Sequence, residues 1–314
     1  MTEDAYQPKR PRAAAVLSLI GNTPLVPLVF QEEGATIYAK CEFLNPSGSI
    51  KDRLAKTVMV DAERRGLLSA DSIILECSSG NTGIALSMLG AAMGYRVTIL
   101  MSQGASVERR HLIRQLGAEL ILFESEGRYQ TGIDMSRDMA AKDSRYFLPR
   151  QFENVLNVED HQHTTGQEII RQLSGPVDAF VTGYGTGGTL AGIGKALKAH
   201  YPECNVYAME PAEAALLLGE CPCCHMIEGV ADGFLPPLLK DAPLDGEVKV
   251  SSKDAMAMTK RLQREFGLLV GTSSGANVTA ALQLAQRLGP KRRVVTLLCD
   301  RAERYFSTAL FEHD

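Results

Sequence analysis

The 314-residue chain lacks several features that mark particular classes of protein. No apolar run approaches the roughly 20 residues of a membrane-spanning helix, and no secretory signal is visible. Charge of one sign is not in large excess either, because 33 Lys and Arg residues face 37 Asp and Glu residues, a net charge of −4. This balance disfavours nucleic acid and anionic membranes as partners. We therefore expect a cytoplasmic protein that binds neither.

Cysteine is present, but it gives no pattern of disulfides. The seven cysteines are an odd number, scattered along a chain long enough to bury a sizeable core without cross-links. Reduced thiols in a cytoplasm are the simplest explanation. Three of them, Cys221, Cys223 and Cys224, precede His225, but no distant second pair completes a two-knuckle zinc site. We expect no metal there, and metal analysis of the purified protein tests this.

From residue 70 onward, short apolar runs alternate with helical patterns. Buried strands are predicted at residues 72–76, 96–101, 120–123, 178–182, 206–209 and 294–298. Helices are predicted near residues 82–93, 106–116, 128–142, 160–173, 187–200, 254–266 and 275–288. This alternation indicates an α/β fold with parallel sheets and helices on both faces. A seam near residues 147–154 divides the pattern into two halves.

Lys51 follows small and polar residues and begins a helical pattern that stops at Gly66. Unpaired backbone N–H groups and the positive end of the helix disfavour an ammonium at that place. A lysine so placed more readily supplies a neutral amine, the form that makes a Schiff base with an aldehyde cofactor. The alternative is an ordinary surface lysine at the start of a helix.

Three glycine-rich turns follow predicted strands, at the sheet edge where ligands collect. Residues 78–83 offer hydroxyls, an amide and helix N–H groups to a carboxylate, and residues 183–189 offer N–H groups and hydroxyls to a phosphate. Residues 271–275 present serines that bond a ring nitrogen or merely cap a helix. The second turn also fits G-x-G-x-x-G, so a nicotinamide (NAD) oxidoreductase is an alternative.

With Lys51 and these three turns in this order, the chain resembles the cysteine synthase family, the fold-type-II pyridoxal-phosphate enzymes that include cystathionine β-synthase. The similarity runs from about residue 17 to residue 308. It implies the cofactor pyridoxal 5'-phosphate, a homodimer, and a tryptophan synthase β-like fold of two three-layer αβα domains with mostly parallel sheets. We expect a smaller domain of residues 46–149 and a larger domain of residues 1–45 plus 150–314.

The resemblance also implies roles for single residues. Lys51 would carry the cofactor as the internal aldimine and remove the substrate α-proton. The substrate carboxylate would be held by Ser78, Ser79, Asn81, Thr82 and Gln151, with Asn81 also near the ring hydroxyl. The cofactor phosphate would be held by Gly185, Thr186, Gly187, Gly188 and Thr189, and Ser273 would face the pyridine nitrogen.

The implied reaction is β-replacement on an O-activated L-serine through an aminoacrylate intermediate. A neutral serine at the ring nitrogen makes the cofactor a weaker electron sink, which suits loss of a β-substituent. O-acetyl-L-serine with sulfide, giving L-cysteine, is the leading pair of small-molecule substrates.

Residues 229–234 depart from the family pattern, since they read Gly-Val-Ala-Asp-Gly-Phe where many members have Gly-Ile-Gly-Ala-Gly-Phe. In the family this loop, which begins at Gly229, lies near the substrate amine and β-carbon. A carboxylate at Asp232 could orient or deprotonate a water or thiol. The alternative function is therefore a cysteine-consuming lyase that releases hydrogen sulfide. Asp232 could equally bond only the N–H groups of its own loop.

His161 is interpreted as part of a polar helix start.

Overall fold

The computed structural model describes residues 8–124, 129–219 and 225–311, which form two compact units. Unit 1 contains the residues up to Gly21 and Asn45–Gln151, and unit 2 contains Asn22–Leu44 and the residues from Phe152 onward. The prediction placed residues 1–45 with the larger domain, whereas described residues 8–21 belong to unit 1. The reason is that Ala13 and Leu17 of helix α1 (Pro11–Leu19) pack into the core of unit 1.

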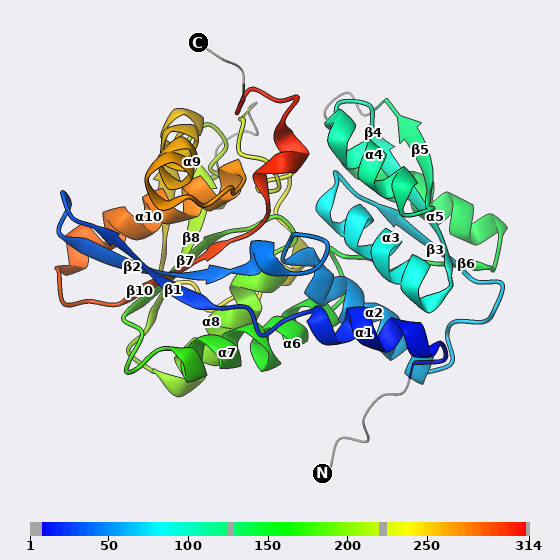
Figure 1. Cartoon of the computed structure of the whole chain (residues 1–314), viewed down its shortest axis with the longest axis horizontal. Helices are drawn as coiled ribbons and strands as arrows, with labels where there is room; N and C mark the ends of the chain where they lie inside the picture. Colours follow the sequence, from blue (N-terminus) through cyan, green and yellow to red (C-terminus); the bar gives the residue numbers. More distant parts are fainter. Residues whose placement is uncertain (1–7, 125–128, 220–224, 312–314) are drawn as a thin grey trace. The chain divides into compact units, whose positions relative to one another are not determined.

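Unit 1 is built on a four-stranded parallel sheet in the order β5-β4-β3-β6 (Figure 1). Its strands are β3 (Ile73–Cys77), β4 (Arg96–Ser102), β5 (Glu119–Phe123) and β6 (Tyr146–Phe147). Its further helices are α2 (Lys51–Arg64), α3 (Asn81–Met93), α4 (Val107–Gln115) and α5 (Tyr129–Lys142). Successive residues of β3 point to opposite faces: Ile74 joins the core under α3, and Leu75 joins the core under α5. Helices therefore cover both faces.

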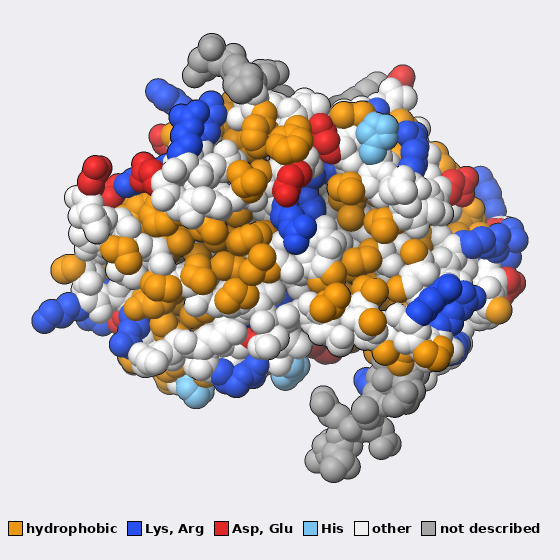
Figure 2. Space-filling view, in the orientation of Figure 1, with side chains coloured by type: hydrophobic (Ala, Val, Ile, Leu, Met, Phe, Trp, Pro, Cys, Tyr) orange, Lys and Arg blue, Asp and Glu red, His pale blue; other side chains and the backbone are white. Residues whose placement is uncertain are grey.

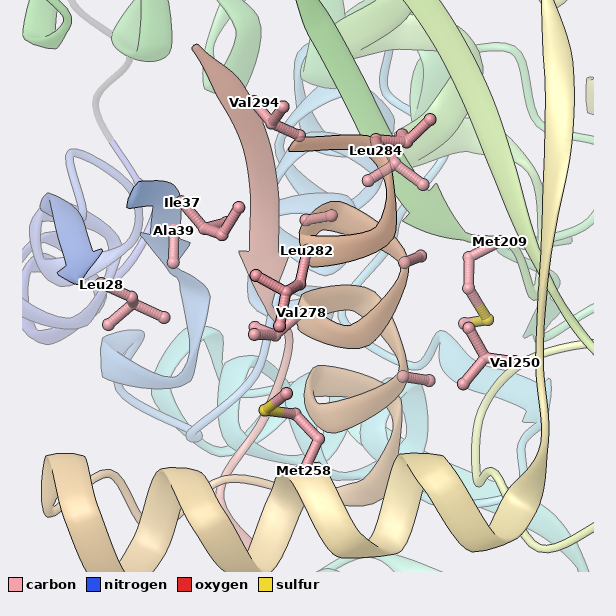
Figure 3. Packing of buried hydrophobic residues seen from close by; sticks show 14 of the residues in the cluster. Leu28, Ile37, Ala39, Met209, Val250, Met258, Val278, Leu282, Leu284 and Val294 are labelled. Carbon is pink, nitrogen blue, oxygen red and sulfur yellow. The ribbon is translucent and has the colours of Figure 1, made fainter. Parts of the chain in front are cut away.

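Unit 2 contains a six-stranded sheet in the order β1-β2-β10-β7-β8-β9, antiparallel between β1 and β2 and otherwise parallel. The strands are β1 (Leu25–Phe30), β2 (Ala35–Cys41), β7 (Ala179–Gly183), β8 (Asn205–Pro211), β9 (Gly246–Val250) and β10 (Val294–Leu298). The helices are α6 (Leu156–His163), α7 (Thr165–Gln172), α8 (Gly188–His200), α9 (Ser252–Phe266) and α10 (Thr272–Leu288). Figure 3 shows α10 between the sheet and α9, with Val278 and Leu282 in the core.

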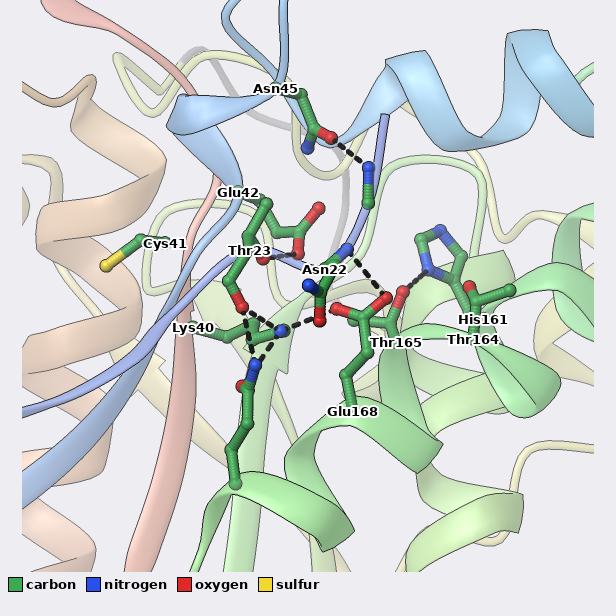
Figure 4. Close-up of polar contacts among 12 residues, drawn as sticks. Asn22, Thr23, Lys40, Cys41, Glu42, Asn45, His161, Thr164, Thr165 and Glu168 are labelled. Carbon is green, nitrogen blue, oxygen red and sulfur yellow. Dashed lines mark hydrogen bonds and ion pairs between the residues drawn. The ribbon is translucent and has the colours of Figure 1, made fainter. Parts of the chain in front are cut away.

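A buried ion pair joins strand β2 to helix α7 within unit 2 (Figure 4). The Lys40 ammonium has no exposed surface and lies 2.6 Å from a Glu168 carboxylate oxygen. It also donates to Gln172 Oε1 at 3.0 Å and to the Thr23 carbonyl oxygen. Glu168 in turn accepts the Asn22 N–H at 2.9 Å. These contacts fix the turn at residues 22–23 against α7.

Over the described residues, no helix combines the length and the apolar character that crossing a bilayer requires. The surface of unit 2 is nevertheless not uniformly polar. Hydrophobic side chains gather over the face that carries β1, β2 and α10 (Figure 2), and Val29 of β1 is 53% exposed.

Candidate active site

Lys51 is the first residue of α2 and is half-buried, at the helix start that the sequence predicts. The turn before it is held by Asp52, whose fully buried carboxylate accepts the Ser47 N–H at 2.7 Å and the Ser47 hydroxyl. Gly48 adopts a φ of +87° and donates its N–H to the Asn45 carbonyl oxygen at 2.7 Å. The backbone around Lys51 is thus fixed by its own turn, with an acidic side chain in the first helical turn, where it is favourable.

The turn at residues 78–83 links β3 to α3 in unit 1. Ser78 is buried, and its Oγ accepts the N–H groups of Gly80 at 3.1 Å and Gly83 at 2.9 Å. Its hydroxyl therefore shapes the turn itself. Ser79 and Asn81, in contrast, are half-buried, so they are the members of the predicted carboxylate site with partly exposed surface.

Gln151 lies beside the same turn, as its predicted role requires, although its side chain bonds protein groups. Its Oε1 accepts the Thr82 hydroxyl at 2.6 Å, and its Nε2 donates to the Cys77 carbonyl oxygen at 2.8 Å. Tyr129 of α5 completes this network: its hydroxyl donates to the Cys77 carbonyl oxygen at 2.8 Å and accepts the Ser79 N–H at 3.1 Å. Sequence reasoning missed Tyr129, because its contact with the turn arises only in the folded unit.

The second turn joins β7 to α8 in unit 2. Gly187 is the N-cap of α8 with a φ of +85°, and no side chain of the described residues caps the helix. A Cβ at Gly185 would lie 2.7 Å from the Gly229 carbonyl oxygen, and a Cβ at Gly188 would lie 2.2 Å from Asn157 Cγ. The turn therefore needs glycine at these positions. Its uncapped N–H groups lie at the positive, N-terminal end of α8, which suits an anion.

Two side chains of α6 support this turn from behind. Asn157 Nδ2 donates to Thr186 Oγ1 at 2.9 Å, and His161 Nε2 lies 3.1 Å from Thr189 Oγ1. His161 Nδ1 also lies 2.9 Å from Thr165 Oγ1. The interpretation of His161 as part of a polar helix start is wrong, since it is buried in the last turn of α6. The spacing of Asn157 and His161, four residues apart on one helical face, is the signal that could have found them.

The loop of residues 225–233 lies against the second turn. The Ala231 N–H donates to the Tyr184 carbonyl oxygen at 2.9 Å, and the Glu228 N–H donates to Thr272 Oγ1 at 3.1 Å. Asp232 is half-buried, and a Cβ at Gly185 would lie 3.4 Å from its Oδ2. A carboxylate thus stands beside the predicted phosphate turn.

The third turn opens α10 and is connected to the second. Ser274 does not cap the helix; instead its buried Oγ accepts the Cys299 N–H at 2.9 Å. Ser273, in the first turn of α10, is a buried residue. Asn277 of α10 accepts the Gly183 N–H at 2.7 Å, which ties the two turns together.

In the ranges that the structure describes, no three His, Cys, Asp or Glu side chains are grouped so that they could hold a metal ion. Cys221, Cys223 and Cys224, at which no metal is expected, lie outside those ranges.

Comparison with known proteins gives consistent matches over nearly the whole chain. The family described as pyridoxal-phosphate dependent enzyme matches residues 16–300. A probable cysteine synthase of Bacillus subtilis is 42% identical over 303 residues, 95% of this chain and 97% of that protein. Among solved structures, an O-ureido-L-serine synthase has a TM-score of 0.90 at 42% identity, covering 95% of this chain and 94% of that one. A hydrogen sulfide-producing enzyme from Fusobacterium nucleatum has a TM-score of 0.90 at 38% identity, with coverages of 96% and 92%.

Proposed function

The chain belongs to the family of pyridoxal-phosphate dependent enzymes, and from that premise we propose that it replaces the β-substituent of O-acetyl-L-serine with sulfide to give L-cysteine. The observation that carries the proposal is the pair of turns in unit 2. In the second turn, the start of α8 has no side-chain cap and requires glycines, so its N–H groups can bind a phosphate. Asn277 hydrogen-bonds this turn to the helix that begins in the third turn, where Ser273 is buried. The likeness to curated cysteine synthases supports the choice of substrates.

The residues of unit 2 fit the cofactor. Residues 185–189 would hold its phosphate through backbone N–H groups and the hydroxyls of Thr186 and Thr189. Asn157 and His161 fix those two hydroxyls from the other side. Ser273 would donate to the ring nitrogen. When bound, pyridoxal phosphate supplies an aldehyde that condenses with amines and withdraws electrons from the carbon next to the amine.

The residues of unit 1 would handle the amino-acid substrate. Lys51 would hold the cofactor aldehyde and, once its amine is released, would take the proton from the substrate α-carbon. Ser79 and Asn81 would bind the substrate carboxylate with the N–H groups that begin α3. Thr82 and Gln151 would keep the turn in shape through their mutual hydrogen bond. We assign Ser78 to the same supporting role, because its Oγ already accepts two N–H groups of the turn.

A second candidate is release of hydrogen sulfide from L-cysteine, with water or a thiol as the acceptor. The observation that favours it is Asp232, a half-buried carboxylate beside Gly185. Asp232 would orient the acceptor and take its proton. The Fusobacterium nucleatum relative is described as hydrogen sulfide-producing, which makes this reaction a direct alternative. Asp232→Asn should slow the step that consumes water or thiol and leave the loss of the first substituent unchanged.

We also propose a cytoplasmic homodimer. The four cysteines of the described ranges are all free thiols, which suits a reducing compartment. The hydrophobic face over β1, β2 and α10 in Figure 2 suits an interface between two copies of the chain. Light scattering coupled to size-exclusion chromatography gives the mass in solution.

Two measurements test the function. Borohydride, which fixes a carbonyl cofactor to the amine that holds it, should label Lys51 in a peptide map. Lys51→Ala should lose the label and lower turnover on the order of 1,000-fold or more. Lys56→Ala is the matched control, because Lys56 lies in the same helix and its ammonium donates to the Leu17 carbonyl oxygen instead.

For the substrates, the enzyme is given O-acetylserine, serine or cysteine, each with sulfide or with water alone, and the amino acid formed is identified. Cysteine from O-acetylserine and sulfide supports the first function, and serine with sulfide from cysteine alone supports the second. A borohydride label on a residue other than Lys51, or activity that requires a nicotinamide cofactor, would contradict both proposed functions.

A further inference from the structure

We propose that Tyr184 is a positioning residue that fastens the Asp232 loop to the phosphate turn and thereby controls the step in which the acceptor adds. The inference rests on the proposed function, and it concerns both versions of it, since sulfide, water or thiol would enter at the same place. Tyr184 lies inside the second turn, between Gly183 and Gly185. The family resemblance implies roles for residues 185–189 of this turn but none for Tyr184.

Tyr184 contacts the loop region at two points. Its carbonyl oxygen accepts the Ala231 N–H at 2.9 Å, one residue before Asp232. Its hydroxyl donates to Glu210 at the end of β8, and the same Glu210 oxygen accepts the Leu217 N–H at 2.9 Å. Leu217 precedes the loop and Ala231 lies near its end. The Tyr184 backbone carbonyl therefore holds the end of the loop at Ala231, while the Tyr184 hydroxyl, through Glu210, is joined to Leu217.

Glu210 makes this attachment unusually dependent on Tyr184. The Glu210 side chain has no exposed surface, and its Oε2 has no hydrogen-bond partner among the described residues. The Tyr184 hydroxyl and the Leu217 N–H are thus the donors that stabilise this buried carboxyl group. Burial and the hydrogen bond to Glu210 both raise the pKa of Tyr184, so its hydroxyl remains a donor at neutral pH. Removing the hydroxyl leaves the buried Glu210 acceptor with one donor, the Leu217 N–H, in place of two, which loosens the hold of Glu210 on Tyr184.

The exit of the loop is strained, so it responds to a loss of attachment. Ala231 adopts a φ of +49°, a conformation that residues other than glycine hold only when the surroundings impose it. The Gly233 N–H bonds back to the Ala231 carbonyl oxygen at 2.7 Å, and His225 Nε2 lies 3.4 Å from that oxygen. Loss of the hydroxyl bond to Glu210 frees the Tyr184 side chain and, with it, the backbone carbonyl that accepts the Ala231 N–H. Ala231 can then relax, and Asp232 moves away from Gly185.

The test uses Tyr184→Phe, with Tyr95→Phe as the matched control. Tyr95 makes the same kind of bond, to Glu63 at 2.6 Å, but in unit 1. Hydrogen exchange followed by mass spectrometry on the chain without cofactor should show peptides of residues 225–233 exchanging about tenfold faster in Tyr184→Phe. Stopped-flow absorbance should show the change produced by O-acetylserine within about twofold of wild type, and its reversal by sulfide, thiol or water slowed about tenfold. Tyr95→Phe should alter neither measurement.

Two further variants test the proposal even if Tyr184→Phe folds poorly. Glu210→Gln keeps the acceptor oxygen and should behave as wild type. The double variant Tyr184→Phe with Glu210→Met removes donor and acceptor together, so it should fold, and it should show the same fast exchange and slow acceptor step. Unchanged exchange in these loosened variants overturns the proposal, as does an equal slowing of both half-reactions. If the wild type turns over none of the substrates, the proposed function fails instead, and the exchange measurement still decides whether Tyr184 holds the loop.

Discussion

At the scale of single residues, Asn157 is a side chain that contacts the turn at residues 183–189, the proposed phosphate site. It donates to Thr186 Oγ1 at 2.9 Å and fills the space where Gly188 lacks a side chain. Asn157→Ala removes the donor and leaves a hole behind the turn. We expect the affinity for pyridoxal phosphate to fall roughly tenfold, because losing this hydrogen bond should cost about 1–2 kcal/mol of binding free energy.

The measurement is a titration of the cofactor-free protein with pyridoxal phosphate, followed by absorbance. Gln162→Ala serves as control, because Gln162 lies in the same helix and its side chain is half-buried away from these contacts. Equal affinities of Asn157→Ala and Gln162→Ala for pyridoxal phosphate would show that the Asn157 amide does not support the turn at residues 183–189.

The same residues show what sequence reasoning can find at this scale. Lys51 and the glycines of the turns were predictable, because their positions follow from local backbone: a helix start and positions where a Cβ would clash. Asn157 and Tyr184 were not, because their roles depend on which distant groups they meet. Ser78 illustrates the converse. Its residue type suggested a carboxylate ligand, and the folded turn shows in addition that its Oγ accepts two N–H groups of that turn.

At the scale of elements, the junction of β2 and α7 depends on the buried pair of Lys40 and Glu168. Lys40→Met removes the cation and leaves a carboxylate that is only 6% exposed without its partner. We expect the free energy of unfolding to drop by about 3–5 kcal/mol, because an uncompensated charge is then buried. Urea denaturation followed by circular dichroism measures it.

Two comparisons isolate the charge effect. Lys40→Met with Glu168→Leu removes both charges and should recover much of the loss. Lys198→Ala breaks the pair with Asp245, whose side chains are 29% and 30% exposed, and should change stability by less than about 1 kcal/mol. A similar loss in Lys198→Ala and Lys40→Met would contradict the argument from burial.

Elements buried on both faces were the predictable ones. Strands β3, β4, β7 and β10 consist mostly of apolar residues and occur where the sequence predicts them. Strand β9 lies at an edge of its sheet and alternates between polar and apolar residues, so it has no such run and was missed. Strand β1, at the other edge, is apolar but contains Pro27, and it was missed as well. The predicted helix at residues 160–173 is two helices, because Thr164 leaves the helical path and its hydroxyl donates to the Asp160 carbonyl oxygen at 2.7 Å.

At the scale of the whole molecule, the predicted α/β fold with mostly parallel sheets and the predicted cofactor are confirmed. The alternation of short strands and helices was enough for the fold class, since parallel sheets require crossover helices. The membership of residues 8–21 was not predictable from composition. These residues look polar and frayed at their start, and only the packing of Ala13 and Leu17 assigns them to unit 1.

The stability of unit 2 should fall at alkaline pH, because it buries two neutral thiols. Burial raises the pKa of Cys41 from 9.0 to about 11 and that of Cys204 to about 12. Both folded-state pKa values lie above the unfolded value, so the stabilisation is full below pH 9. It is lost as the pH rises toward 11–12, since the unfolded chain releases these protons first. At pH 10 each thiol should cost about 1 kcal/mol of unfolding free energy relative to pH 8. Urea midpoints measured between pH 7 and 10.5 test this, and Cys41→Ala with Cys204→Ala should show a shallower decline above pH 9. An equally steep decline in the double variant would assign the alkaline loss to other groups.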